Sequence, residues 1–161
     1  MNVYEQARTF AVEAHTSIGQ VRKYTGEPYH THVLRVAELV STRTQDQEVL
    51  AAACLHDVLE DVEPLKPEYG RERILREFGQ RVLDLVVELT DIYTKENHPD
   101  KNRKTRKRLE AERLAGISEE AKLIKRADLH DNGSSFHGTS FEKTWLEEKK
   151  LLDELLGAWE S

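Results

Sequence analysis

The chain has 161 residues, a length typical of one domain, and its 34% of charged residues indicates a globular protein with a heavily charged exterior. Thirty Asp and Glu against 24 Lys and Arg give a net charge of −6, which argues against nucleic acid as a partner. The one cysteine, Cys54, excludes an intramolecular disulfide and is expected to be a buried, inert thiol, and no apolar run suits a membrane span or a signal peptide. We therefore expect a single cytoplasmic domain over residues 1–161 that does not bind membranes.

Helical periodicity dominates the sequence, and strand alternation is nearly absent. Apolar stripes predict helices in these ranges: 7–14, 33–40, 44–59, 74–78, 82–89, 101–115, 118–129 and 141–158. The third of these helices is expected to open with a capping-box spacing between Thr44 and Gln47. Residues 91–100 are expected to form a loop, and Gly133 is expected to mark a turn. The pattern predicts an all-α bundle of roughly seven to nine helices.

The most informative segment is His56–Asp61, which carries four ionisable side chains inside an apolar run. In a regular helix His56 and Glu60 share one face, and so do Asp57 and Asp61. Burial of so many charges beside residues 51–55 is unfavourable unless a cation or protons compensate. An ordinary acidic helix end that runs into the next loop explains the same spacing equally well.

Two other segments shift the balance toward a cation. His32 lies where the second helix is expected to begin, and Asp128 ends the apolar run of a later helix. With His56 and Asp57, these residues would provide two imidazoles and two carboxylates, a mixed donor set that suits Mn²⁺, Fe²⁺ or Zn²⁺. Such a set leaves positions open for water and substrate, as a catalytic centre requires.

The order of the motifs resembles that of the HD-domain (p)ppGpp hydrolases, which include the hydrolase domains of RelA/SpoT-type proteins and stand-alone small alarmone hydrolases. The matching stretches occur in the order of that family: Ala14-His15, Gly19–Lys23, Gly26–Tyr29, His32, Leu55–Asp57, Glu60-Asp61, Glu77–Gly79, Leu89-Thr90, Ala121–Asp128 and Asn132. These stretches define a motif-bearing core at about residues 4–136. We expect no synthetase domain in a chain of this length, which favours the stand-alone hydrolases. The resemblance implies the HD-domain phosphohydrolase fold, a helical bundle around a metal-centred pocket.

The resemblance also implies a role for each matching residue. One divalent ion, with Mn²⁺ favoured over Fe²⁺ and Zn²⁺, would be held by four ligands: His32, His56, Asp57 and Asp128. Glu60 and Asp61 would position and deprotonate the attacking water. Contacts to the nucleotide would come from these residues: Arg22, Lys23, Asn132 and Ser135. The implied reaction is removal of the 3′-pyrophosphate from (p)ppGpp, which yields GDP or GTP and pyrophosphate.

The sequence departs from the long RelA/SpoT enzymes at two places. Tyr24 and Thr25 lengthen the spacing between Lys23 and Gly26 by one residue, and Leu129–Asp131 stands where those enzymes have a basic residue, a leucine and a histidine. The substrate therefore stays open between a guanine alarmone, its adenine counterpart (p)ppApp and NADPH, which would lose its 2′-phosphate. A catalytically idle nucleotide-binding module is the non-enzyme alternative, although every ligand is present. The pattern does not decide between a monomer and a homodimer.

Residues 101–108 contain six cationic side chains. One interpretation is a solvated helix face whose charges pair with Glu110 and Glu112. The other interpretation is a surface that attracts a polyphosphorylated nucleotide, with Lys104 and Arg108 facing the pocket together. We give both interpretations equal weight, and a nucleic-acid-binding arm is disfavoured by the overall negative charge.

Overall fold

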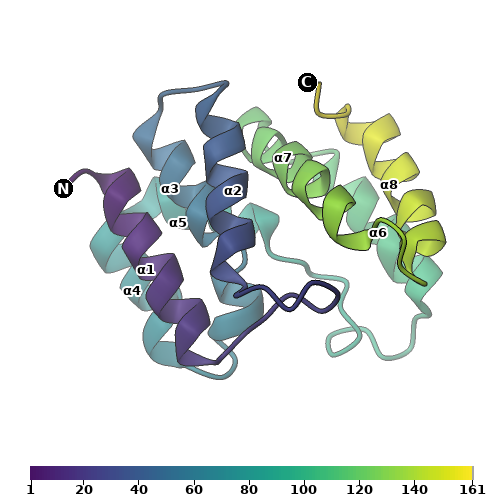
Figure 1. The fold of residues 1–161 in the computed structure, drawn as a ribbon, viewed down its shortest axis with the longest axis horizontal. Coiled ribbons are helices and arrows are strands. Elements are labelled where there is room, and N and C mark those ends of the chain that lie inside the picture. Colours follow the sequence, from purple (N-terminus) through teal and green to yellow (C-terminus); the bar gives the residue numbers. More distant parts are fainter. Residues whose placement is uncertain (161) are drawn as a thin grey trace.

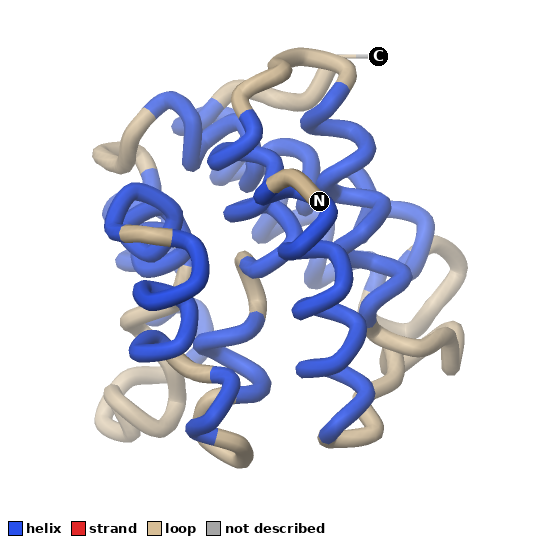
Figure 2. The backbone as a smooth tube through the Cα atoms, turned by 90° about the vertical axis from the view of Figure 1, so that its left-hand side faces the viewer, coloured by secondary structure: helices blue, strands red, loops and turns tan. Residues whose placement is uncertain are grey.

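The computed structural model describes residues 1–160, in which helices are joined by loops and no strand is drawn in the tube view (Figure 2). The α-helices have the following bounds: α1 Val3–Ser17, α2 His30–Ser41, α3 Gln47–Leu55, α4 Arg71–Phe78, α5 Gln80–Leu89, α6 Arg103–Leu114, α7 Glu119–Phe136 and α8 Glu142–Leu156. A π-helical turn, Val58–Val62, and a 3₁₀ turn, Pro67–Tyr69, lie between α3 and α4. The structure confirms the all-α class expected from the periodicity.

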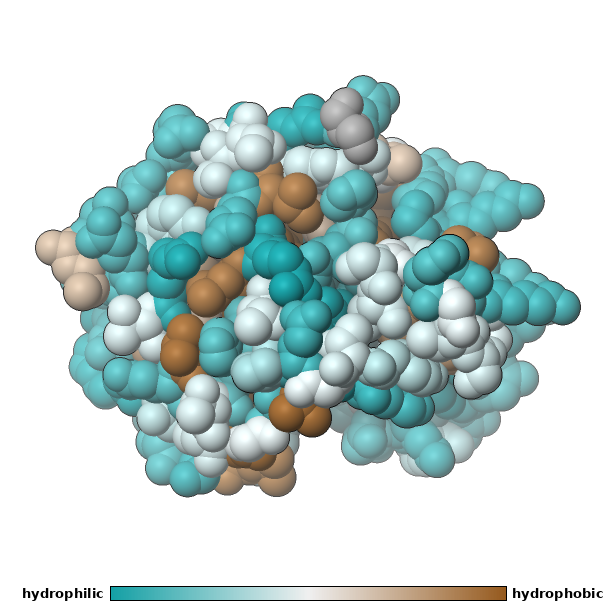
Figure 3. Space-filling model, in the orientation of Figure 1, coloured by the Kyte–Doolittle hydropathy of each residue, from teal (hydrophilic) through white to brown (hydrophobic). Residues whose placement is uncertain are grey.

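Helix α3 forms the centre of the hydrophobic core because it is apolar on every face. All side chains from Val49 to Leu55 are buried, and α3 packs against α1, α2 and α5. The outside of the molecule is different: the face shown in Figure 3 is mainly hydrophilic, with apolar residues scattered over it. None of the helices in residues 1–160 combines the length and the apolar character that crossing a bilayer requires.

Helix α7 connects the two sides of the molecule. Figure 1 shows α1 and α4 on one side, α6 and α8 on the other, and α7 between α2 and α8. The contacts agree with this view, because α7 packs against α2, α5 and α8, whereas α6 packs mainly against α8. This arrangement brings α2, the end of α3 and α7 together, although they are far apart in the sequence.

The structure corrects both ends of the third predicted helix. Its N-terminal cap is Asp46 rather than Thr44, since a carboxylate oxygen of Asp46 accepts the backbone N–H of Glu48 at 3.2 Å. Thr44 instead accepts the backbone N–H of Asp46 through its hydroxyl oxygen at 3.1 Å. At the other end, α3 stops at Leu55, and the chain continues into the π-helical turn instead of running as one helix to residue 59.

The prediction of a turn at Gly133 is also wrong, because α7 continues through this residue to Phe136. A glycine inside a helix costs about 0.5–1 kcal/mol relative to alanine, so its local preference is weak. Helix α8 packs over this residue, and a Cβ atom at Gly133 would be in ordinary contact, 3.4 Å from the ring of Trp145. Because α7 continues, Asn132 and Ser135 lie on the same helix as Asp128.

Candidate metal centre

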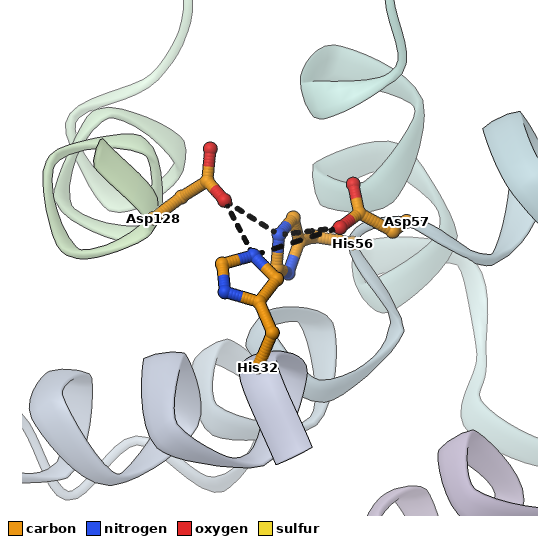
Figure 4. Close-up of side chains that lie close together, drawn as sticks. All are labelled: His32, His56, Asp57 and Asp128. Atoms are coloured by element: carbon orange, nitrogen blue, oxygen red, sulfur yellow. Dashed lines mark hydrogen bonds and ion pairs between the residues drawn. The ribbon is translucent and has the colours of Figure 1, made fainter. Parts of the chain in front are cut away.

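Four side chains converge where α2, the end of α3 and α7 meet. His32 lies in the first turn of α2, His56 and Asp57 follow directly after α3, and Asp128 lies on α7. Their ligand atoms are all within 4.8 Å of one another, and Figure 4 shows the four side chains pointing toward one another. The structure thus brings together every residue that the sequence predicts as a metal ligand.

The end of helix α3 explains how two neighbouring residues reach the same point. Successive side chains of a regular α-helix point about 100° apart, because the helix has about 3.6 residues per turn. The backbone leaves this geometry at Asp57, whose φ of −105° and ψ of 0° start the π-helical turn. As a result Asp57 Oδ2 lies 3.2 Å from His56 Nε2. The helix faces expected from i, i+4 spacing are therefore not those of the structure, and π-helical turns are frequent at functional sites.

The distances between the donor atoms match those of ligands around one cation. His32 Nε2 lies 2.8 Å from Asp128 Oδ1 and 3.8 Å from Asp57 Oδ2. His56 Nε2 lies 3.3 Å from Asp128 Oδ1. Two ligand atoms that are each about 2.1 Å from an ion, at right angles, are about 3.0 Å apart. Two imidazole nitrogens and two carboxylate oxygens at these spacings fit one divalent ion of the Mn²⁺, Fe²⁺ or Zn²⁺ type.

The charges in the group balance one another in the absence of a cation. Burial lowers the pKa of His32 and His56, but the neighbouring carboxylates outweigh burial and leave both pKa values raised. Burial raises the pKa of Asp57 and Asp128, yet His56 and Lys125 respectively outweigh it and leave both pKa values lowered. The carboxylates thus favour the protonated form of both imidazoles. Metal ions bind neutral imidazole and ionised carboxylate, so a divalent cation would displace these protons.

Glu60 and Asp61 lie in the π-helical turn beside this group, each held through one carboxylate oxygen. Glu60 Oε1 accepts the backbone N–H of Asp91 at 3.1 Å, and Asp61 Oδ2 accepts a side-chain N–H of Gln20 at 3.1 Å. Burial and the charges of Asp91 and Asp57 raise the pKa of Glu60 to about 8. Burial and the charge of Asp57 raise the pKa of Asp61 to about 7. Both groups can therefore bind and release a proton near neutral pH.

Three of the expected nucleotide contacts are tied into the protein. Arg22 is only 5% exposed; its Nη1 donates to Asp131 at 3.2 Å and its Nη2 to Asn132 Oδ1 at 2.9 Å. Asn132 in turn donates to Asp128 Oδ1 at 3.4 Å, and Ser135 is buried on the same helix. Asn132 therefore contacts a metal ligand directly and Arg22 is linked to it through Asn132, whereas Lys23 is exposed, with its ammonium 5.3 Å from the centre of the Tyr24 ring.

The basic segment is divided between two environments. Lys104 and Arg108 both line a groove of about 590 Å³ between α6 and α8. Arg108 also pairs with Glu112 at 3.1 Å on the helix surface, which agrees with a solvated face. Glu110 is buried and pairs with Arg113 instead of with a cation of residues 101–108. The half-buried Lys107 lies close enough to Asp91 for its charge to act on that carboxylate.

Several residues that support the site were not singled out as site residues in the sequence. The Tyr29 hydroxyl donates to Asp57 Oδ2 at 2.7 Å, and Lys125 Nζ donates to Asp128 Oδ2 at 2.9 Å. Asp131 Oδ2 lies 2.6 Å from His32 Nδ1. Lys125 and Asp131 are each three residues from Asp128 on α7, a spacing that places them on its helix face. Gln20 and Asp91 reach Asp61 and Glu60 from loops, and no spacing rule could have paired them.

A comparison with known protein families matches residues 7–128 to the HD domain, which covers more than half of the chain. Among curated proteins, the guanosine-3′,5′-bis(diphosphate) 3′-pyrophosphohydrolase of Drosophila melanogaster is 40% identical over 107 residues, which cover 65% of this chain and 54% of the relative. The same enzyme of Xenopus tropicalis is 38% identical over 127 residues, with 76% and 63% covered. The chain thus spans about half to two-thirds of the length of these relatives.

A comparison with solved structures also finds similarity to a protein described as a ppGpp hydrolase. A structure described as a metazoan ortholog of SpoT that hydrolyzes ppGpp superimposes with a TM-score of 0.80 and 30% sequence identity, and the match covers 97% of this chain and 86% of the other. A structure from Listeria monocytogenes matches with a TM-score of 0.62 and 25% identity over 86% of this chain and 87% of the other. These comparisons confirm the resemblance that the sequence motifs indicate.

Proposed function

This chain belongs to the HD domain family, and from that premise we propose that it is a metal-dependent hydrolase that removes the 3′-pyrophosphate from (p)ppGpp. The products would be GDP or GTP and pyrophosphate. The resident ion in this proposal is Mn²⁺, held by His32, His56, Asp57 and Asp128; the mixed nitrogen and oxygen donor set supports a divalent ion of this type, and the family resemblance favours Mn²⁺ among them. We place the reaction in the cytoplasm.

One observation carries the proposal: two carboxyl groups with pKa values near neutrality lie next to a buried group of two histidines and two aspartates. A general base works best when its pKa is close to the operating pH. A purely structural role does not explain two carboxyl groups with raised pKa values, because buried carboxylates without cationic partners destabilise a fold. Perturbed pKa values beside a cluster of metal-ligand residues are typical of functional sites.

When bound, a divalent ion supplies Lewis-acid chemistry, since it polarises a phosphoryl oxygen and lowers the pKa of water. The side chains of the protein orient the water, accept its proton and hold the ligands in position. Glu60 and Asp61 each keep one carboxylate oxygen on a fixed donor, which leaves the other oxygen to orient the attacking water and accept its proton. Tyr29 donates to Asp57 Oδ2, the oxygen that faces the two histidines, and Lys125 donates to the outer oxygen of Asp128, so both carboxylates are fixed in orientation.

Recognition of the nucleotide is the second part of the proposal. Lys23 is exposed and available to a phosphate, whereas Arg22, Asn132 and Ser135 would line the site from within the protein. Lys104 and Arg108 would attract the charged substrate to the protein through their long-range field, although the groove that they line between α6 and α8 includes none of the metal ligands. Lys107 lines the same groove, and its charge acts to lower the pKa of Asp91, whose backbone N–H donates to Glu60.

The test is hydrolysis of a nucleotide panel by the purified, Mn²⁺-loaded protein, with pyrophosphate and orthophosphate measured separately. Release of pyrophosphate from ppGpp or pppGpp is the expected result. Orthophosphate from NADPH, or pyrophosphate only from (p)ppApp, would assign one of the alternative substrates. The matched control is His56→Ala, prepared in the same way, because it removes a ligand without changing the basic surface. Binding of a nucleotide without any turnover would leave only the non-catalytic module.

A further inference from the structure

Asp131 lies behind the metal centre, at a position where the sequence departs from the long RelA/SpoT enzymes. Its side chain is 8% exposed and lies on α7, one turn from Asp128. Asp131 Oδ2 is 2.6 Å from His32 Nδ1, the ring nitrogen that faces away from the other ligands. On the other side of the same ring, His32 Nε2 faces Asp128 Oδ1 at 2.8 Å. The imidazole is therefore held between two carboxylates of one helix.

Two arginines fix the charge and the position of Asp131. Arg22 Nη1 donates to Oδ2 at 3.2 Å, and Arg35 Nε donates to Oδ1 at 2.9 Å. Arg35 is itself held by Glu27 Oε2 at 3.1 Å. A carboxylate that faces two guanidinium groups is ionised and can only accept hydrogen bonds. It follows that the hydrogen between Asp131 and His32 belongs to the Nδ1 atom of His32.

This assignment decides which nitrogen of His32 meets a cation. A neutral imidazole with its hydrogen on Nδ1 presents the lone pair of Nε2, and Nε2 is the atom that faces Asp57 and Asp128. His56 reaches the same state by a different route, because its Nδ1 lies 2.6 Å from the backbone carbonyl of Ala53 and can only donate there. A carboxylate partner additionally makes the ligating nitrogen more basic, which a carbonyl does to a smaller extent.

We propose that Asp131 is a positioning residue of the metal centre, which holds His32 in the Nδ1–H form and so raises the affinity of the site for a divalent cation. The role depends on the two arginines, because without them the carboxylate would be a buried, unpaired charge. Arg22 thereby serves the metal site from behind, through Asp131 and Asn132, in addition to any contact with substrate. The inference rests on the proposed metal centre but not on the identity of the substrate.

Metal affinity tests this role without any measurement of turnover. Mn²⁺ is titrated into metal-depleted protein by calorimetry, for the wild type and for Asp131→Asn. We expect the variant to bind about 10–100-fold more weakly, the usual effect of removing such a hydrogen-bond partner. Glu27→Gln is the matched control, since it removes a carboxylate of the same network that does not touch His32, and its affinity should stay close to that of the wild type. Asp131→Glu keeps the charge and should recover part of the lost affinity.

Thermal melting of the same proteins separates a positioning role from a purely structural one. A lower melting temperature for Asp131→Asn with unchanged Mn²⁺ affinity would overturn the proposal. A wild-type protein that binds no Mn²⁺ would overturn both the metal centre and this role, whereas a wild type that binds and an Asp131→Asn variant that binds equally would overturn this role alone.

Nitrogen-15 spectra of the Zn²⁺-loaded wild type provide a test that does not depend on the folding of any variant. The His32 ring should show a hydrogen on Nδ1, with the metal-bound nitrogen being Nε2. A metal bound to Nδ1 of His32 would contradict the inference, because Asp131 would then have no hydrogen to accept.

Discussion

His56 is the residue on which the metal centre depends most directly, because it is buried, contacts both aspartates and receives its orientation from a backbone carbonyl. We expect His56→Ala to lose metal retention and hydrolytic activity together. Elemental analysis of the purified variant measures the first and pyrophosphate release the second. His137→Ala is the control, since the His137 side chain is 85% exposed and lies outside the site. Full metal occupancy in His56→Ala would show that the assigned ligand set is wrong.

Glu60 is expected to act on the water rather than on the metal. Glu60→Gln keeps the shape of the side chain and the acceptor for the Asp91 backbone N–H, but it cannot accept a proton. We therefore expect Glu60→Gln to retain metal while kcat falls by about 10²–10⁴, the usual contribution of a general base. Asp61→Asn gives the matching measurement for the second carboxyl group. Unchanged kcat in Glu60→Gln would remove Glu60 from the mechanism.

The raised pKa of Glu60 also makes the stability of the metal-depleted protein depend on pH. In the unfolded chain this carboxyl group titrates at about 4.3, whereas in the folded protein its pKa is about 8. Between these values the folded state holds a proton that the unfolded state has released, so stability falls as the pH rises through this window. The melting temperature should therefore decrease from about pH 5 to about pH 8, and less steeply in Glu60→Gln.

The exposed Glu38 provides the control for this measurement, because Glu38→Gln removes a carboxylate that pairs with Arg8 at the surface and should reproduce the wild-type slope. Addition of Mn²⁺ should raise the melting temperature most at the upper end of the window, where protons no longer compensate the carboxylates. A wild type and a Glu60→Gln variant with identical slopes would show that Glu60 does not hold the proton.

At the scale of elements, the cationic side chains of helix α6 are expected to attract the negatively charged nucleotide to a protein whose net charge is negative. Lys104 and Arg108 line the groove between α6 and α8, so removing both charges should raise KM with little change in kcat. The effect should be large at low salt and fade at high salt, because the Debye length falls from about 30 Å at 0.01 M to about 8 Å at 0.15 M. Steady-state kinetics of the double alanine variant at several salt concentrations measures this dependence.

Lys122→Ala is the matched control for α6, since Lys122 lies on α7 and pairs with Glu119 at the protein surface. A double variant with wild-type kinetics at low salt would show that residues 101–108 are only a solvated face. The exposed ion pair between Arg108 and Glu112 agrees with such a solvated face.

At the scale of the whole molecule, Cys54 reports the cooperativity of the core. The side chain is fully buried in α3, and burial raises the pKa of its thiol to about 12, so the reactive thiolate is absent near neutral pH. We expect thiol reagents to label the native protein only as fast as it unfolds, and Mn²⁺ to slow the labelling further because it binds the folded state. Rapid labelling of native protein would show that α3 opens locally.

Local signals in the sequence predicted most of the elements and the ligands. Periodicity identified most of the α-helices because they bury an apolar stripe, whereas α3 is apolar on every face, and the four ligand residues stood out because ionisable side chains beside apolar runs need compensation. The errors occurred where local preference was weak. Gly133 continues α7 instead of marking a turn, and the ring of Trp145 from the following helix packs beside it.

The sequence by itself determined the all-α class, the family resemblance and the identity of the candidate ligands, since these depend on residue types and on their spacing along the chain. Only the tertiary structure decided how they act together. It ended α3 before Asp57 so that neighbouring residues converge, and it placed Gln20 and Asp91 on the acidic pair. It also set Asp131 between His32 and two arginines. These contacts join side chains from separate elements. The distances between such side chains follow from how the helices pack and not from the periodicity of the sequence.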